Sequence, residues 1–131
     1  MKISRTMLRD HLRGVTVSYF SHHDVAPADI GDYAPFAANV RDSAARRGDL
    51  PWLKLGLAHV LERRGQDWDD LNGGIYAFGR GELVDLVEIV WEELWPEEAP
   101  AAVAGAADVE LVEMSTEDWN AHKAGLAAPG A

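Results

Sequence analysis

The sequence of 131 residues contains no cysteine. This absence excludes disulfide scaffolds, thiolate zinc sites, iron–sulfur clusters and cysteine nucleophiles. The chain also has no apolar run of the roughly 18 residues that a membrane span needs, and its first residues lack the apolar stretch of a signal peptide. These absences predict a cytoplasmic protein without a membrane-spanning segment.

Basic residues are almost missing from the second part of the chain. The net charge is −10, and residues 81–131 contain 12 acidic residues against the single base Lys123. Such a surface repels phosphate backbones, so we expect no direct binding to nucleic acid. It can instead attract a basic protein partner. The alternative is that the acidic surface only keeps the protein soluble.

The composition is that of a globular protein, with 47% apolar and 26% charged residues. We therefore predict a single globular domain over residues 1–125, followed by a frayed tail over residues 126–131. Within the domain, the Ala/Pro-rich residues 96–107 are typical of a flexible connection.

Apolar residues at helical spacing, together with capping residues, predict several helices. Ser4 and Asp49 are the expected N-caps of two of them, while Gly14 and Gly48 are expected to end helices. The expected helices cover residues 4–14, 35–48, 49–65 and 83–95, and a further short one follows a capping box at Ser115.

Two other segments are rich in β-branched residues that alternate between faces. They are residues 15–20 and residues 109–114, and we expect them to pair with each other because neither has another convincing partner. Residues 75–78, after a turn at Asn72 and Gly73, are a candidate third strand. The predicted class is therefore α+β and predominantly helical, with four or five helices around one core and a small two- or three-stranded sheet.

The candidate functional residues lie on the helix predicted at 83–95. Its apolar stripe is expected to be buried, which turns Asp85, Glu88, Glu92 and Glu93 outward. Glu88 and Glu92 are like charges four residues apart, an arrangement that costs a few tenths of a kcal/mol in a helix. Trp95 lies beside these carboxylates, one position off the stripe, where an aromatic side chain suits a basic partner surface.

A second candidate is the loop segment His22, His23 and Asp24. Imidazole and carboxylate groups bind metals, but adjacent ligands diverge and the sequence has no HExxH motif. His59 and Glu62 are spaced i, i+3, as on an ordinary helix surface. The sequence thus predicts no catalytic residue, cofactor or metal, and the alternative hypothesis is a small metal-assisted hydrolase that uses the loop segment.

The leading hypothesis is a small acidic protein-binding module that engages a basic partner through one helix face. In size, acidity and lack of cysteine the chain is broadly similar to bacterial immunity proteins and other small inhibitors, although no motif carries this similarity. A non-catalytic accessory subunit is a further alternative.

Overall fold

A computed structural model describes residues 1–21, 23, 29–72 and 82–126. The elements, in chain order, are β1 (Lys2–Ser4), α1 (Arg5–Phe20), the 3-10 helix η1 (Ile30–Phe36), α2 (Ala37–Arg47), α3 (Leu50–Glu62), the 3-10 helix η2 (Asp69–Asn72), α4 (Glu82–Leu94), α5 (Pro100–Ala104), β2 (Glu110–Val112) and α6 (Thr116–Ala124). This arrangement confirms the predicted class, a predominantly helical α+β fold with a small sheet.

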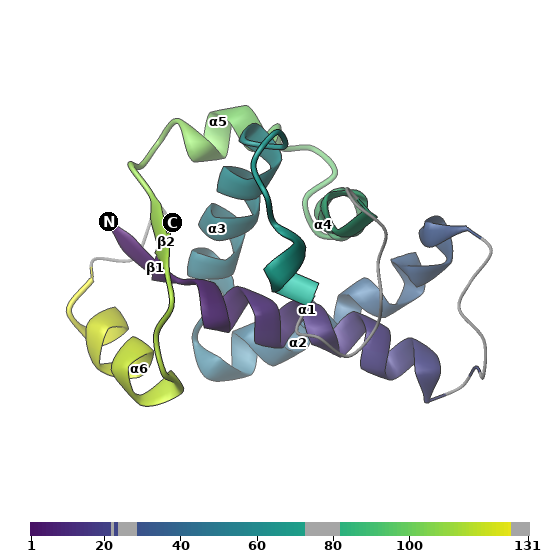
Figure 1. The fold of residues 1–131 in the computed structure, drawn as a ribbon, viewed down its shortest axis with the longest axis horizontal. Helices are drawn as coiled ribbons and strands as arrows, with labels where there is room; N and C mark the ends of the chain where they lie inside the picture. Colours follow the sequence, from purple (N-terminus) through teal and green to yellow (C-terminus); the bar gives the residue numbers. More distant parts are fainter. Residues whose placement is uncertain (22, 24–28, 73–81, 127–131) are drawn as a thin grey trace.

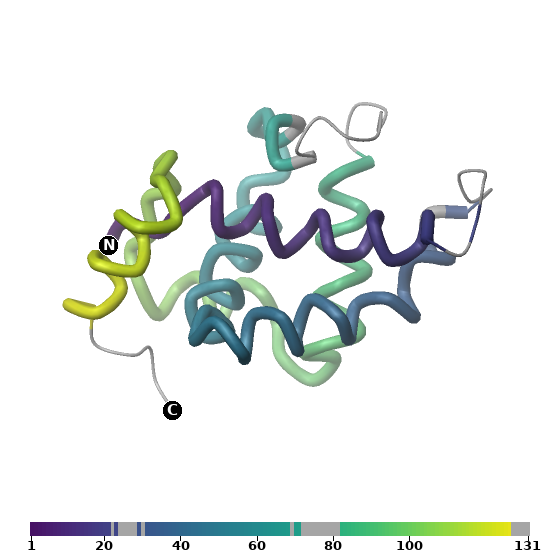
Figure 2. Tube along the Cα trace, turned by 90° about the horizontal axis from the view of Figure 1, so that it is seen from below, coloured from purple at the N-terminus to yellow at the C-terminus, as the bar shows by residue number. Residues whose placement is uncertain are grey.

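The helices enclose one apolar core. Helix α2 runs back along α1, and the two lie side by side over much of their length (Figures 1 and 2). Helix α4 is seen almost end-on in Figure 1, so it crosses α1 at a steep angle. The sheet and α6 gather at the N-terminal end of α1. Leu8, Leu53, Leu57 and Val87, from three different helices, are fully buried in the core.

The first helix is longer than the sequence predicts. The expectation that Gly14 ends it, and that residues 15–20 form a strand, is wrong, because α1 continues to Phe20. Val15 and Tyr19, four residues apart, are both buried, as one face of a helix requires. In a strand Val17 would lie on the same face as these two residues, but it is 48% exposed. The period of burial, and not the β-branched composition, decides the structure here. The buried hydroxyl of Thr16 is satisfied within the helix, since it donates to the Arg13 carbonyl at 3.1 Å.

The strand β2 therefore pairs with a different segment from the one that the sequence predicts. The strand expected within residues 109–114 is present as β2, but it pairs with β1 and not with residues 15–20. The two strands are parallel, and Ile3 lies opposite Leu111. Ser4, the last residue of β1, also caps α1 by accepting a hydrogen bond from the Met7 amide at 3.0 Å, as predicted.

A sharp turn separates α2 from α3. Gly48 has φ of 70°, a left-handed conformation that glycine adopts without strain, and it ends α2 as predicted. Helix α3 begins directly after Asp49, also as predicted, but the Asp49 side chain makes no capping bond to it. The Asp49 carboxylate is therefore left for other contacts.

Residues 96–107, predicted as a connection, contain helix α5. Val103 and Ala104 of this helix are half-buried against the core, and α5 packs on α3. The candidate strand at residues 75–78 and Gly73 of the predicted turn lie outside the described residues, as do residues 127–131 of the predicted tail. Leu126 is described and packs half-buried against the core.

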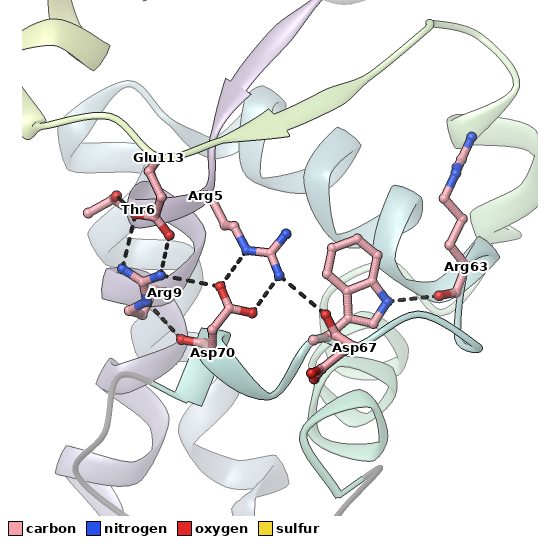
Figure 3. Close-up of polar contacts among 8 residues, drawn as sticks. Arg5, Thr6, Arg9, Arg63, Asp67, Asp70 and Glu113 are labelled. Carbon is pink, nitrogen blue, oxygen red and sulfur yellow. Dashed lines mark hydrogen bonds and ion pairs between the residues drawn. The ribbon is translucent and has the colours of Figure 1, made fainter.

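Two arginines of α1 hold neighbouring elements in place (Figure 3). Arg5 forms a two-pronged ion pair with Asp70 of η2. Arg9 donates to the Asp70 carbonyl at 2.9 Å and pairs with Glu113, just after β2. Hydrogen bonds from Arg9 and Thr6, aided by the Arg9 charge, lower the pKa of Glu113. This network fixes η2 and the end of β2 to one side of α1.

Candidate functional site

Helix α4 presents its carboxylates to solvent as the sequence predicts. The residues Leu83, Leu86, Val87, Val90 and Trp91 of the apolar stripe are buried, and Leu94 is half-buried. Asp85, Glu92 and Glu93 are exposed on the opposite side, and Glu88 is half-exposed. We call these four residues the acidic face. Ile89 is half-buried and falls between them at helical spacing, so the face has an apolar centre.

One carboxylate of the acidic face has a basic partner. Glu88 accepts a hydrogen bond from Arg64 at 3.0 Å, and this bond, with the attraction of Glu88, raises the Arg64 pKa although partial burial opposes it. Among the described residues, Asp85, Glu92 and Glu93 form no ion pair. The like-charge cost on the helix is therefore only partly offset within the chain.

Trp95 is half-buried and packs on the core. Its ring lies 4.8 Å from the ring of Trp91, centroid to centroid, and the Lys54 ammonium lies 5.7 Å from its centroid. Lys54 also pairs with Glu98 at 2.5 Å. The structure thus places Trp95 at the end of the acidic face, with one side of its ring already covered by this chain.

The candidate metal loop is only partly described. His22 and Asp24 lie outside the described residues. His23 is exposed, and its ring stacks on that of Tyr19 with the centroids 4.2 Å apart. In the part of the chain that the structure describes, no three histidine or acidic side chains come together in a group that could hold a metal ion.

A buried polar cluster, which sequence reasoning missed, surrounds Asp49. The Asp49 carboxylate is 3% exposed. It accepts hydrogen bonds from His11 Nε2 at 2.8 Å, from Trp119 Nε1 at 3.0 Å and from Lys123 Nζ at 2.7 Å. Lys123 also donates to the Arg47 carbonyl at 2.8 Å. Asp49 therefore joins α1 and α6 to the turn between α2 and α3.

The same cluster contains a serine. Ser43 Oγ lies 3.2 Å from His11 Nδ1, so Ser43, His11 and Asp49 form a hydrogen-bonded chain. This connectivity is that of a nucleophile, a base and an orienting acid. However, His11 is 2% exposed, and a cavity of about 230 Å³ beside Asp49 is lined by neither Ser43 nor His11. This series of hydrogen bonds links α1 to α2 and to the turn before α3.

The ionisation of Asp49 is tuned by its neighbours. Burial alone raises the pKa of a carboxyl group, but the hydrogen bonds from His11, Lys123 and Trp119 outweigh burial and lower the Asp49 pKa to about 2. The folded pKa lies below the unfolded one, so the stabilisation is complete above pH 4 and is lost as the pH falls towards 2.

We therefore expect the Asp49 carboxyl to remain ionised at pH 3. The 13C chemical shift of Asp49 Cγ, followed from pH 6 downward, should have completed only about a tenth of its change at this pH. Over the range from pH 4 to pH 2 the lost interaction amounts to about 2 kcal/mol of folding stability. A titration midpoint near 3.8, the value of an unperturbed aspartate, would contradict this account of the cluster.

His59 is a second buried histidine, after His11, and the spacing of apolar residues along its helix did not predict its burial. The sequence places it on the surface of its helix, but it is 8% exposed and its ring meets that of Trp68 edge-to-face at 5.9 Å. Glu62 is exposed, as expected. His59 packs against Trp68, nine residues further along the chain, and helical spacing alone carries no information on that contact.

Comparisons with protein-family models, with curated proteins and with solved structures found no match to this chain. Among the described residues, no helix combines the length and the apolar character required to cross a bilayer.

Proposed function

We propose that the protein binds a basic protein partner through the acidic face of α4, without chemistry of its own. The observation that carries the proposal is the exposure of Asp85, Glu92 and Glu93 on one side of a helix whose other side is buried. None of these three carboxylates is neutralised by an ion pair within the described residues.

Further features support a protein partner over a small cation. The half-buried Ile89 between the carboxylates gives the face an apolar centre with a charged rim, which is the usual anatomy of a protein interface. Trp95, directly after the same helix, is only partly buried. Since the net charge of the chain is −10, a basic partner is attracted from a distance as well as at contact.

The test uses variants that change charge but not packing. The variant Asp85→Asn, Glu92→Gln removes two charges from the acidic face and leaves the Glu88 pair with Arg64 intact. Its control, Asp42→Asn, Glu117→Gln, removes two exposed charges from other helices. Both variants should fold with a free energy of unfolding within about 0.5 kcal/mol of the wild type.

Immobilised wild-type protein and both variants are exposed to an extract of the cells that make the protein, at low and at high salt. A partner of the acidic face should be retained by the wild type and by the control, released at high salt, and lost from the Asp85/Glu92 variant. With the purified partner, the variant should lower the association rate by about tenfold at low salt, and less at high salt. An association rate equal to that of the control at every salt concentration would show that the acidic face is only solvated surface.

A further inference from the structure

An open cavity of about 290 Å³ lies at the opposite end of α3 from Asp49, between the end of α3, the start of α1 and β2. Its walls include the side chains of Arg5, His59, Arg63, Gln66, Trp68 and Glu110. Five of these six residues carry nitrogen donors on their side chains, and two of the five, Arg5 and Arg63, are permanent cations. With Arg5 and Arg63 against Glu110 among its lining residues, and with Arg5 also paired to Asp70, the cavity is less acidic than the protein as a whole.

His59 is the unexplained group in this cavity. It is 92% buried, yet neither of its ring nitrogens forms a hydrogen bond to any described residue. A buried polar group without a partner costs about 1–3 kcal/mol, and such groups in folded proteins are normally met by a water molecule or a ligand. Because His59 lines the cavity, its missing partner belongs there.

The two arginines have unused donors. Arg5 lies over the Trp68 ring, 4.9 Å from its centroid, and its Nε and Nη2 atoms bind Asp70 and the Asp67 carbonyl. Its Nη1 forms no hydrogen bond among the described residues. Arg63 is exposed, and its side chain makes no ion pair in the described part of the chain. Figure 3 shows Arg5 and Arg63 on opposite sides of the indole that donates to the Arg63 carbonyl.

We propose that this cavity binds a phosphate group, either free or carried by a small molecule, between Arg5, His59 and Arg63. Donors that approach from separate sides suit the tetrahedral oxygens of phosphate better than the planar pair of a carboxylate, and guanidinium groups bind phosphate with charge-assisted hydrogen bonds. The imidazole of His59 supplies a third donor beside the two guanidinium groups, and the phosphate gives His59 the hydrogen-bond partner that it lacks among the described residues.

The charge around His59 is consistent with an anion. Burial lowers the His59 pKa, and the positive charges of Arg63 and Arg5 lower it further, against the opposing effect of Asp108. A bound dianion reverses the effect of the two arginines, so it should raise the pKa of His59. Among the described residues that line the cavity, Glu110 is the one carboxylate, and it opposes the anion.

Three single substitutions test the proposal because their expected effects differ in sign. Arg63→Gln removes a cavity cation. Arg64→Gln is the control, since it changes the net charge by the same amount. Arg64 is the next residue along the chain and donates to Glu88. Glu110→Gln removes the opposing carboxylate. All three residues are exposed, so the melting temperatures in chloride should stay close to that of the wild type.

Inorganic phosphate and phenyl phosphate are titrated into each protein by calorimetry, at constant ionic strength maintained with sodium chloride. We expect Arg63→Gln to weaken phosphate binding by about tenfold, Arg64→Gln to leave it within about twofold, and Glu110→Gln to tighten it by about threefold. Tighter binding of phenyl phosphate would identify a phosphate monoester as the ligand class, while equal binding would identify free phosphate.

The ring signals of His59 provide an independent measurement, assigned with a His59→Gln variant. Added phosphate should shift these signals and raise the pH at which they titrate. If Arg63→Gln and Arg64→Gln weaken binding equally, or if the His59 signals do not respond, phosphate is only a general counter-ion of the surface and the proposal fails. The proposal does not depend on the function of the acidic face, since Arg63→Gln and Glu110→Gln leave its four carboxylates and the Glu88 pair with Arg64 unchanged.

Discussion

Replacing Asp49 by alanine is expected to lower the free energy of unfolding by about 3–5 kcal/mol. The reason is that three donors lose their common acceptor at once: His11, Trp119 and Lys123 all bind the Asp49 carboxylate. Lys123, whose side chain is only 16% exposed, would keep its charge with one backbone carbonyl as its remaining hydrogen-bond partner. Urea unfolding followed by circular dichroism measures the loss.

The control is Asp42→Ala, which removes an exposed aspartate of α2 whose contact with Arg41 is long, at 3.4 Å. We expect it to cost less than about 1 kcal/mol. The conservative change Asp49→Asn keeps the volume and one acceptor oxygen, so its cost should fall between the two. If Asp49→Ala is no more damaging than Asp42→Ala, the cluster does not hold the fold together.

The Asp49→Ala variant should also weaken α6 before the rest of the protein. Trp119 is the one buried side chain of α6, and its indole donates to Asp49. Limited proteolysis should therefore cleave near Lys123 in the variant under conditions in which the wild type and Asp42→Ala stay intact.

Replacing Gly56 by valine is expected to destabilise the protein by about 2–3 kcal/mol. Gly56 lies where α3 passes α1, and a Cβ atom at this position would lie 2.7 Å and 2.9 Å from the two methyl groups of Leu8. Leu8 is itself fully buried, so its methyl groups cannot turn away into solvent. The overlap therefore has to push the two helices apart.

Two further variants separate this steric effect from the intrinsic preference of the helix. Gly14, in the middle of α1, has nothing within 4 Å of an added Cβ, so Gly14→Ala should stabilise the protein by about 0.5–1 kcal/mol. Leu8→Ala should cost about 3 kcal/mol alone but much less in the Gly56→Val background, since it makes room for the new side chain. Additive costs of Leu8→Ala and Gly56→Val would exclude a clash between these two positions.

Local signals in the sequence predicted much of the helical structure. Ser4 and Ser115 cap helices through their side chains, Gly48 ends α2, and the stripe of α4 is buried. Each of these features depends on residues within about one helical turn of one another, so the spacing of residue types along the chain is sufficient to predict it. The exposure of Asp85 and Glu92 followed from the same periodicity.

The features that sequence reasoning missed depend on contacts between distant segments. His11 and Asp49 are separated by 38 residues, and Asp49 and Trp119 by 70. Asp49 was correctly placed at the start of a helix, but its local capping role was replaced by a long-range one. In the same way, residues 15–20 have the composition of a strand, and only the packing of α1 against α2 and η1 makes them helical.

The parallel pairing of β1 with β2 sets an order for folding. A ribosome releases Ile3 more than a hundred residues before Leu111, its partner across the sheet. Contacts between the helices that lie closer along the chain can form earlier, because they close shorter loops. We therefore expect the backbone of β1 to remain hydrated during synthesis until β2 emerges, and the sheet and α6 to form after the contacts between α1, α2 and α3.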